Sequence, residues 1–280
     1  MHASSTPPRR HARCTPLAVL AAVVLVLASL VAPVQAATLD EARQPISGAW
    51  DGLRETLYPD RRIDIASDAF MRIEAPANTP DPAATPVSIH FGAEALGQLQ
   101  RVRVIIDNNP SPLAASIDIA ADVPMTALDL RVRVDRYTSV RAIAETRDGR
   151  VLMRSGWIKA SGGCSAAPAA TEGGAPGEIR IRAADDALVI GVRHPNHSGF
   201  QIDPRTGDTI PPFFIARIAL VRDGKPLLSA DTGISLSENP GLRIAFAEPL
   251  HGSVAVEAMD STGARFSTTW RAEGAPTASR

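Results

Sequence analysis

Hydrophobic and polar residues alternate along several short segments in the first half of the chain. The clearest is residues 128–134, where Leu and Val alternate with Asp and Arg. The same alternation recurs in residues 87–91 and 102–106. A period of two is typical of half-buried β-strands. Residues 141–146 and 151–158 flank the turn dipeptide Asp148-Gly149 and are expected to form a hairpin.

The second half of the chain also consists of short segments in which hydrophobic and polar residues alternate. Its predicted strands are residues 179–181, 188–192, 215–221, 226–229, 242–246, 254–258 and 266–270. No stretch between these strands has a helical period. Short strands at this spacing predict an all-β chain, with an antiparallel β-sandwich in each half.

One segment before the strands has the period of an α-helix. Hydrophobic residues at i, i+4, i+7 and i+11 place four side chains on one face: Ile46, Trp50, Leu53 and Leu57. Pro45 suits the first helical turn and Pro59 ends the segment. We therefore expect a short N-terminal helix.

A segment poor in large side chains separates the two halves. Of its 17 residues, 161–177, 12 are Gly, Ala or Pro. This composition predicts a mobile linker between one sandwich at 37–160 and another at 178–272. Residues 273–280 contain no core residues and are expected to form a loose tail.

Residues 1–36 have the pattern of a cleaved secretory signal peptide. Three arginines precede an uncharged run from Leu17 to Ala32, and residues 33–36 end in Ala36 with small residues at the cleavage positions. An uncleaved membrane anchor is the alternative. We expect an exported protein that has no membrane segment after cleavage.

Charge and cysteine content then narrow the possible functions. Cleavage after Ala36 would leave 244 residues with 26 basic and 30 acidic side chains, a net charge of −4. This balance argues against nucleic acid or an anionic membrane as a partner. Cleavage would also remove Cys14 and leave Cys164 as the one cysteine, so no internal disulfide is possible.

Cys164 follows two glycines, Gly162 and Gly163, within the linker. Glycine frees the backbone and removes bulk, which favours an exposed, reorientable sulfur. The alternative to an exposed carrier sulfur is that Cys164 is an incidental loop thiol or a cysteine folded against the domain. Lys159 could lower the thiol pKa modestly. No Cys-His-Asn pattern supports a thiol hydrolase, so the setting favours a carrier thiol over a catalyst.

These segments resemble a known family of sulfur carriers. Residues 107–112, 140–153 and 157–164 resemble the SoxY subunit of the sulfur-oxidation carrier. Residues 194–204, 210–215 and 237–240 resemble its partner SoxZ. The pattern is most similar to fused SoxYZ-like carriers that accompany quinoprotein dehydrogenases in bacteria.

The resemblance implies immunoglobulin-like sandwiches that pack on each other and a periplasmic carrier that holds sulfur intermediates covalently on Cys164. Gly162 and Gly163 would be its flexible arm, and sulfur-oxidising or quinoprotein dehydrogenase system proteins its partners. No catalytic residue, cofactor or metal is implied. Ser165 and Ala166 depart from the family's Gly-Gly-Cys-Gly-Gly pattern, which makes the segment after the thiol stiffer.

Other candidate groups and functions carry less weight. His194 and His197 have a metal-like spacing, but no cysteine or carboxylate set completes a site. Arg154 is the candidate for binding a sulfur oxyanion, although a solvated strand face explains it better. An accessory module for a quinoprotein dehydrogenase is the second hypothesis for function, and a thiol-dependent enzyme is the third.

Overall fold

A computed structural model describes residues 48–168, 174–184 and 186–272. The predicted signal peptide, Ile46 and the predicted tail lie outside these residues. The described residues belong to one compact unit. Within the described part of the chain, no helix is long and apolar enough to cross a membrane.

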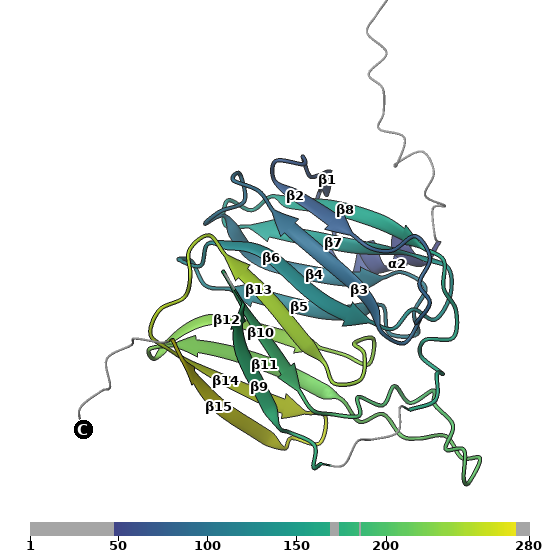
Figure 1. Cartoon of the computed structure of the whole chain (residues 1–280). Helices are drawn as coiled ribbons and strands as arrows, with labels where there is room; N and C mark the ends of the chain where they lie inside the picture. Colours follow the sequence, from purple (N-terminus) through teal and green to yellow (C-terminus); the bar gives the residue numbers. More distant parts are fainter. Residues whose placement is uncertain (1–47, 169–173, 185, 273–280) are drawn as a thin grey trace, which may run out of the picture. The chain divides into compact units, whose positions relative to one another are not determined.

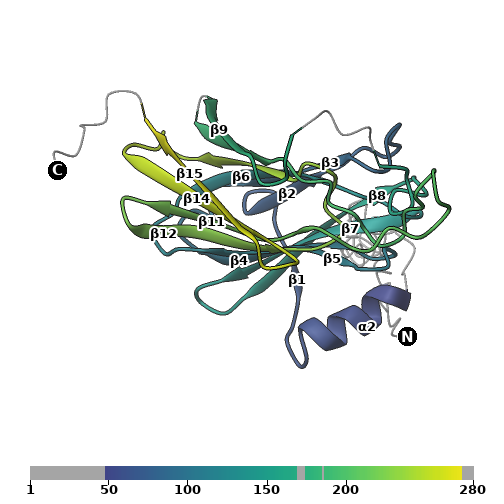
Figure 2. The same cartoon turned by 90° about the horizontal axis from the view of Figure 1, so that it is seen from below.

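The predicted helix is present as α2 (Gly48–Leu57). It buries Trp50 and packs Leu53 and Leu57 against a small hydrophobic cluster that contains Ile105 and Ile143. Figure 2 shows α2 on the outside of the larger β-sheet. The helical period of the sequence therefore places three side chains against the sheet, as expected.

Strands make up most of the remaining structure. In chain order they are β1 (Asp64–Ile65), β2 (Met71–Glu74), β3 (Thr85–Phe91), β4 (Leu99–Ile106), β5 (Leu113–Ile119), β6 (Met125–Val132), β7 (Thr138–Thr146), β8 (Val151–Ile158), β9 (Ile179–Ala184), β10 (Ala187–Val192), β11 (Ile215–Arg222), β12 (Lys225–Thr232), β13 (Gly241–Phe246), β14 (Ser253–Asp260) and β15 (Arg265–Arg271). The expected hairpins β7–β8 and β11–β12 are both antiparallel pairs. The all-β prediction is confirmed.

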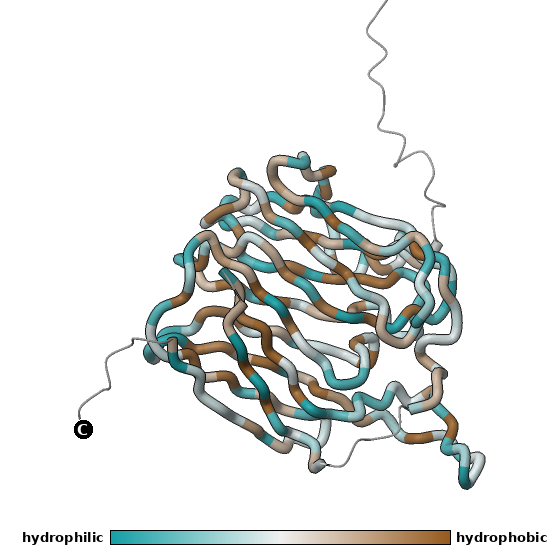
Figure 3. The backbone as a smooth tube through the Cα atoms, in the orientation of Figure 1, coloured by the Kyte–Doolittle hydropathy of each residue, from teal (hydrophilic) through white to brown (hydrophobic). Residues whose placement is uncertain are grey.

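The strands form two sheets that pack face to face (Figure 1, Figure 2). The nine-stranded sheet has the order β1-β8-β7-β4-β5-β12-β11-β14-β15, and the six-stranded sheet has the order β2-β3-β6-β13-β10-β9. One hydrophobic core lies between the sheets and includes residues from both halves, such as Val104, Leu128, Leu220 and Ile244. Figure 3 shows hydrophobic and polar residues alternating along the strands, which is how each strand buries one face.

The two predicted sandwiches share both of their sheets. In the larger sheet β5 pairs with β12, so that Ile117 lies opposite Ala230. In the smaller sheet β6 pairs with β13, so that Leu128 lies opposite Ile244. The two halves are thus joined by backbone ladders as well as by side-chain packing. This arrangement fixes the loops of one half against those of the other.

Candidate functional site

The segment that carries Cys164 follows β8 and lies along the chain that follows β6. We call residues 161–168 the arm. The amide of Gly162 donates to the carbonyl of Asp135 over 2.8 Å, and the amide of Gly163 donates to the carbonyl of Val134 over 3.0 Å. These two hydrogen bonds hold the arm against the first half of the protein.

Gly162 and Gly163 serve different purposes in this conformation. Gly162 has a φ of 79°, in the left-handed region that glycine adopts at low cost. Gly163 fits a tight space, since a Cβ there would lie 2.1 Å from the carbonyl oxygen of Pro82 and 2.7 Å from the amide nitrogen of Val134. Gly163 is therefore required for close packing of the arm, a role that differs from the flexible joint expected from the sequence.

The second half of the protein holds the arm from the other side. The hydroxyl of Ser198 donates to the carbonyl of Cys164. The side-chain amide of Gln201 donates to the carbonyl of Ala166 over 2.9 Å, and its oxygen accepts the amide of Ser198 over 3.1 Å. Ser198 and Gln201 are both buried. The arm is thus enclosed between loops of the two halves.

Cys164 is fully buried in this docked position, with 0% of its surface exposed. Burial, followed by the nearby charge of Asp135, raises the pKa of the thiol to about 12, and the charge of Arg133 opposes this. The expectation of an exposed sulfur is wrong for this conformation, because partners far away in the sequence satisfy the polar groups of the arm. The expected lowering of the thiol pKa by Lys159 is also wrong.

Arg133 is the cation beside the docked arm. It is only 2% exposed, and its Nη1 donates to the carbonyl of Gly163 over 3.1 Å, while Nη2 donates to the carbonyl of Asn196 over 3.2 Å. Its Nε has no hydrogen-bond partner among the described residues. Sequence reasoning favoured Arg154, which instead forms an ion pair with Asp68. The alternating pattern of residues 128–134 predicts that Arg133 lies on a strand, but it does not indicate that the side chain is buried.

Two asparagines hold the loops that surround the arm. Asn109 donates to the carbonyl of Arg133 over 2.7 Å and to the hydroxyl of Ser235 over 2.9 Å, and its oxygen accepts the amide of Asp135 over 2.9 Å. Asn196 donates to the carbonyl of Leu236 over 2.9 Å. Both side chains are buried, and Asn109 links the two halves through Ser235.

His194 and His197 are held by contacts within the second half of the protein. The Nδ1 of His194 accepts the amide of Asn196 over 3.1 Å, and its ring centre lies 4.3 Å from that of Phe213. Burial lowers the pKa of His194 to about 4. His197 Nδ1 lies 3.2 Å from the Gln201 side-chain oxygen. Among the described residues no group of three or more potential metal ligands is present. Both histidines lie in the loop whose Ser198 and Gln201 contact the arm.

A hollow of about 610 Å³ lies beside this loop and is lined from both halves. Leu113 lines it from the first half, while Phe200, Pro212 and Phe214 line it from the second. Ser198, which holds the Cys164 carbonyl, is also part of its wall. The docked arm therefore lies next to a largely apolar hollow.

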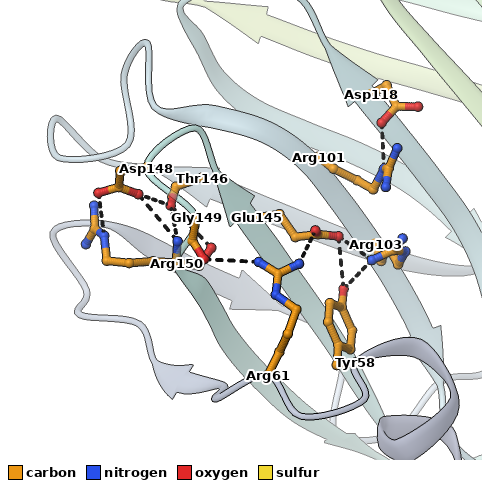
Figure 4. A network of polar contacts seen from close by, with 10 residues as sticks. All are labelled: Tyr58, Arg61, Arg101, Arg103, Asp118, Glu145, Thr146, Asp148, Gly149 and Arg150. Carbon is orange, nitrogen blue, oxygen red and sulfur yellow. Dashed lines mark hydrogen bonds and ion pairs between the residues drawn. The ribbon is translucent and has the colours of Figure 1, made fainter.

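A second polar cluster lies beneath α2 (Figure 4). Glu145 is an ion-pair partner of both Arg61 and Arg103, and Arg103 donates to the hydroxyl of Tyr58 over 2.7 Å. Burial raises the pKa of Tyr58, and the adjacent charge of Arg103 opposes that effect. Every charge in this cluster has a partner, which indicates a structural role.

Comparison with protein families gives two matches in tandem. Residues 54–164 match the family described as sulfur oxidation protein SoxY, and residues 172–271 match the family described as sulphur oxidation protein SoxZ. The first match ends at Cys164. A comparison with curated proteins found no matching sequence.

Three solved structures match this chain at low identity. The sulfur carrier protein SoxY from Chlorobium limicola f thiosulfatophilum is 18% identical, with 40% of this chain and 94% of that chain covered and a TM-score of 0.34. A β-glycosidase from Bacteroides vulgatus is 10% identical, covering 74% and 25%, with a TM-score of 0.24. A marsupial T cell receptor is 5% identical, covering 74% and 63%, with a TM-score of 0.26. On the two tandem matches, the chain therefore carries a SoxY-like domain followed by a SoxZ-like domain.

Proposed function

We propose that the protein is a periplasmic carrier that holds sulfur intermediates covalently on Cys164 and presents them to partner enzymes. The observation that carries this proposal is the position of Cys164 at the last residue of the SoxY match, on an arm that follows directly from β8. The tandem SoxZ match supports the same role. The N-terminal signal pattern supports export.

The docked position gives the carrier a resting state. A thiol whose pKa is about 12 is protonated at neutral pH, and the thiolate is the nucleophile. A buried sulfur also cannot enter the active site of another protein. Loading and unloading therefore require the arm to leave its place between the two halves, and the hydrogen bonds of the arm set how often it does so.

The contacts that hold the arm can break while both sheets stay folded. They consist of backbone and side-chain hydrogen bonds, each worth about 1 kcal/mol net. Ser198 and Arg133 each contribute one such contact next to Cys164. The strand ladders of both sheets lie outside the arm. We therefore assign the movement to the arm alone.

Intact mass spectrometry of protein from its native periplasm tests the carrier role. The carrier role predicts added masses of sulfur or sulfur oxyanions on the peptide that contains Cys164, absent in Cys164→Ser. A thiol that is always unmodified, in cells that are oxidising reduced sulfur, would contradict the proposal. The same preparation with Ser165→Ala serves as a matched control, because it alters a neighbouring exposed side chain and keeps the thiol.

A second candidate is an accessory module of a quinoprotein dehydrogenase, in which the thiol has no carrier role. The complete burial of Cys164 favours this alternative, and the resemblance to carriers that accompany such enzymes suggests the partner. Co-purification with a quinoprotein dehydrogenase that is unaffected by Cys164→Ser, together with an unmodified thiol, would support it. Loss of the association in Cys164→Ser would count against it.

A further inference from the structure

Arg133 is a buried cation that no carboxylate contacts in the described part of the chain. Its two terminal nitrogens donate to the neutral carbonyls of Gly163 and Asn196. Its Nε is buried and has no hydrogen-bond partner there. Carbonyls satisfy its hydrogen bonds but carry no net charge. A buried charge whose nearby carboxylates, Glu238 and Asp81, lie beyond ion-pair distance is incompletely compensated, so the site favours an additional anion.

The charges around Arg133 indicate at which position an anion would stabilise the guanidinium most. Burial lowers the pKa of Arg133, and a negative charge on the sulfur of Cys164 would oppose this more than the charges of Glu238 and Asp81 do. The free thiol of Cys164 is neutral at physiological pH and supplies no charge. A negatively charged group attached to this sulfur would therefore compensate the guanidinium better than the thiol does.

Asp135 is the charge that opposes an anion at this position. Its carboxylate acts on Cys164 and raises the pKa of the thiol. It also lies 3.6 Å from the guanidinium of Arg136, and 19% of its side chain is exposed. Solvent and Arg136 therefore screen Asp135, whereas Arg133 is enclosed.

We propose that Arg133 forms an anion subsite for a sulfur oxyanion group carried on Cys164, so that an arm loaded with a charged adduct docks more tightly than a neutral arm. This inference rests on the proposed carrier function and names the class of adduct that the docked site selects. Guanidinium donors match the oxygens of sulfonate groups in geometry and charge. Nε is a donor with no partner among the described residues and can serve this purpose.

Two chemical labels compare a charged adduct with a neutral one. The Cys164 thiolate attacks an inner sulfur of tetrathionate, the central S–S bond breaks, and thiosulfate leaves with the electron pair. A thiosulfonate adduct remains, the cysteine sulfur is oxidised, tetrathionate is reduced, and the thiol proton passes to solvent. Methyl methanethiosulfonate reacts in the same way, releases methanesulfinate and leaves a neutral methyl disulfide. Both adducts are attached through one new S–S bond.

Hydrogen exchange at the amides of Gly162 and Gly163 then measures docking, because both amides are bonded to the first half when the arm is docked. We expect exchange about tenfold slower in the thiosulfonate adduct than in the methyl adduct, as for one hydrogen bond to a charged group. Arg133→Gln should abolish the difference, and Arg133→Lys should restore part of it. Equal exchange of the two adducts, or the same difference in Arg133→Gln, would overturn the inference.

A second variant keeps the test decisive where Arg133→Gln disturbs folding. Asp135→Asn removes the opposing charge and leaves Arg133 in place, so it should slow exchange further for the charged adduct alone. No change in that adduct would contradict the subsite. Free sulfate that protects the unmodified arm to the same extent would show a site for free anions and overturn the covalent version. Failure of tetrathionate to label Cys164 would overturn the carrier function itself, together with this inference.

Discussion

Ser198 donates a hydrogen bond to the carbonyl oxygen of Cys164, although the two residues are 34 positions apart and belong to different halves of the chain. This contact makes the position of the thiol depend on both domains at once. A cysteine that looks free in the sequence is therefore held by the partner domain. The accessibility of Cys164 becomes a measure of how the two halves fit together.

Ser198→Ala should make Cys164 more reactive. The variant removes the hydroxyl donor and leaves the Cys164 carbonyl without that partner, which costs about 1 kcal/mol in the docked state. We expect iodoacetamide to alkylate Cys164 several-fold faster at pH 8. Ser267→Ala, at an exposed position on β15, should leave the alkylation rate unchanged. An unchanged rate in Ser198→Ala would show that this contact does not hold the arm.

Gly163→Ala should displace the arm from its docked position. The added Cβ would lie 2.1 Å from the carbonyl oxygen of Pro82 and 2.7 Å from the amide nitrogen of Val134. Both are backbone atoms, which cannot move aside as easily as the end of a side chain can. We expect an increase in the alkylation rate of Cys164 of at least about tenfold, with little loss of global stability. The matched control is Gly191→Ala, because Gly191 has no neighbouring atom within 4 Å of an added Cβ. A variant that alkylates like the control would show that Gly163 is not tightly enclosed.

The stability of the docked protein should fall with rising pH through Cys164. Burial raises the folded-state pKa from 9.0 to about 12. Below pH 9 the thiol is protonated in both the folded and unfolded states, so it adds no pH dependence. Between pH 9 and pH 12 only the unfolded or undocked state releases the proton, which lowers the stability of the docked state.

Urea unfolding at pH 8 and pH 10.5 measures this effect. The midpoint of the wild type should fall more between the two pH values than that of Cys164→Ser. The difference between the two proteins isolates Cys164 from other groups that titrate in the same range. Equal shifts in the two proteins would indicate that the thiol is not buried in solution.

The two halves should remain associated after the chain between them is cut. The β5–β12 and β6–β13 ladders join the halves through both sheets and do not depend on a covalent connection. A protease site inserted between Pro168 and Gly174 allows cleavage in one place. We expect both fragments to elute together in size-exclusion chromatography and to separate only in denaturant. Separate elution under native conditions would contradict the paired sheets.

The sequence predicted those parts of the fold that depend on local periodicity. The alternation in residues 128–134 and the turn at Asp148-Gly149 match the observed β6 and the β7–β8 hairpin. The strand β5 was missed, because its buried Ala114 and Ala115 are small and break the simple alternation of large apolar residues. That strand is the one that joins the larger sheet across the two halves.

The arrangement around Cys164 could not be predicted in the same way. Cys164 and its glycines stood out by composition alone, but their docking depends on contacts with Arg133 and Ser198 that only the folded chain brings together. Arg133 lies in a strand-like alternation of charged and apolar residues, which is typical of a solvated face. Its burial follows from the loop of the second half that covers it, a tertiary effect with no local signal.

The mass of the Cys164 peptide, in protein isolated from the periplasm of cells that are oxidising a reduced sulfur compound, tests the central claim most directly. The carrier account predicts a fraction of that peptide with added sulfur or sulfur oxyanion mass, removed by a reductant and absent from Cys164→Ser. A Cys164 peptide found only as the free thiol, in cells that continue to oxidise the compound, would contradict it.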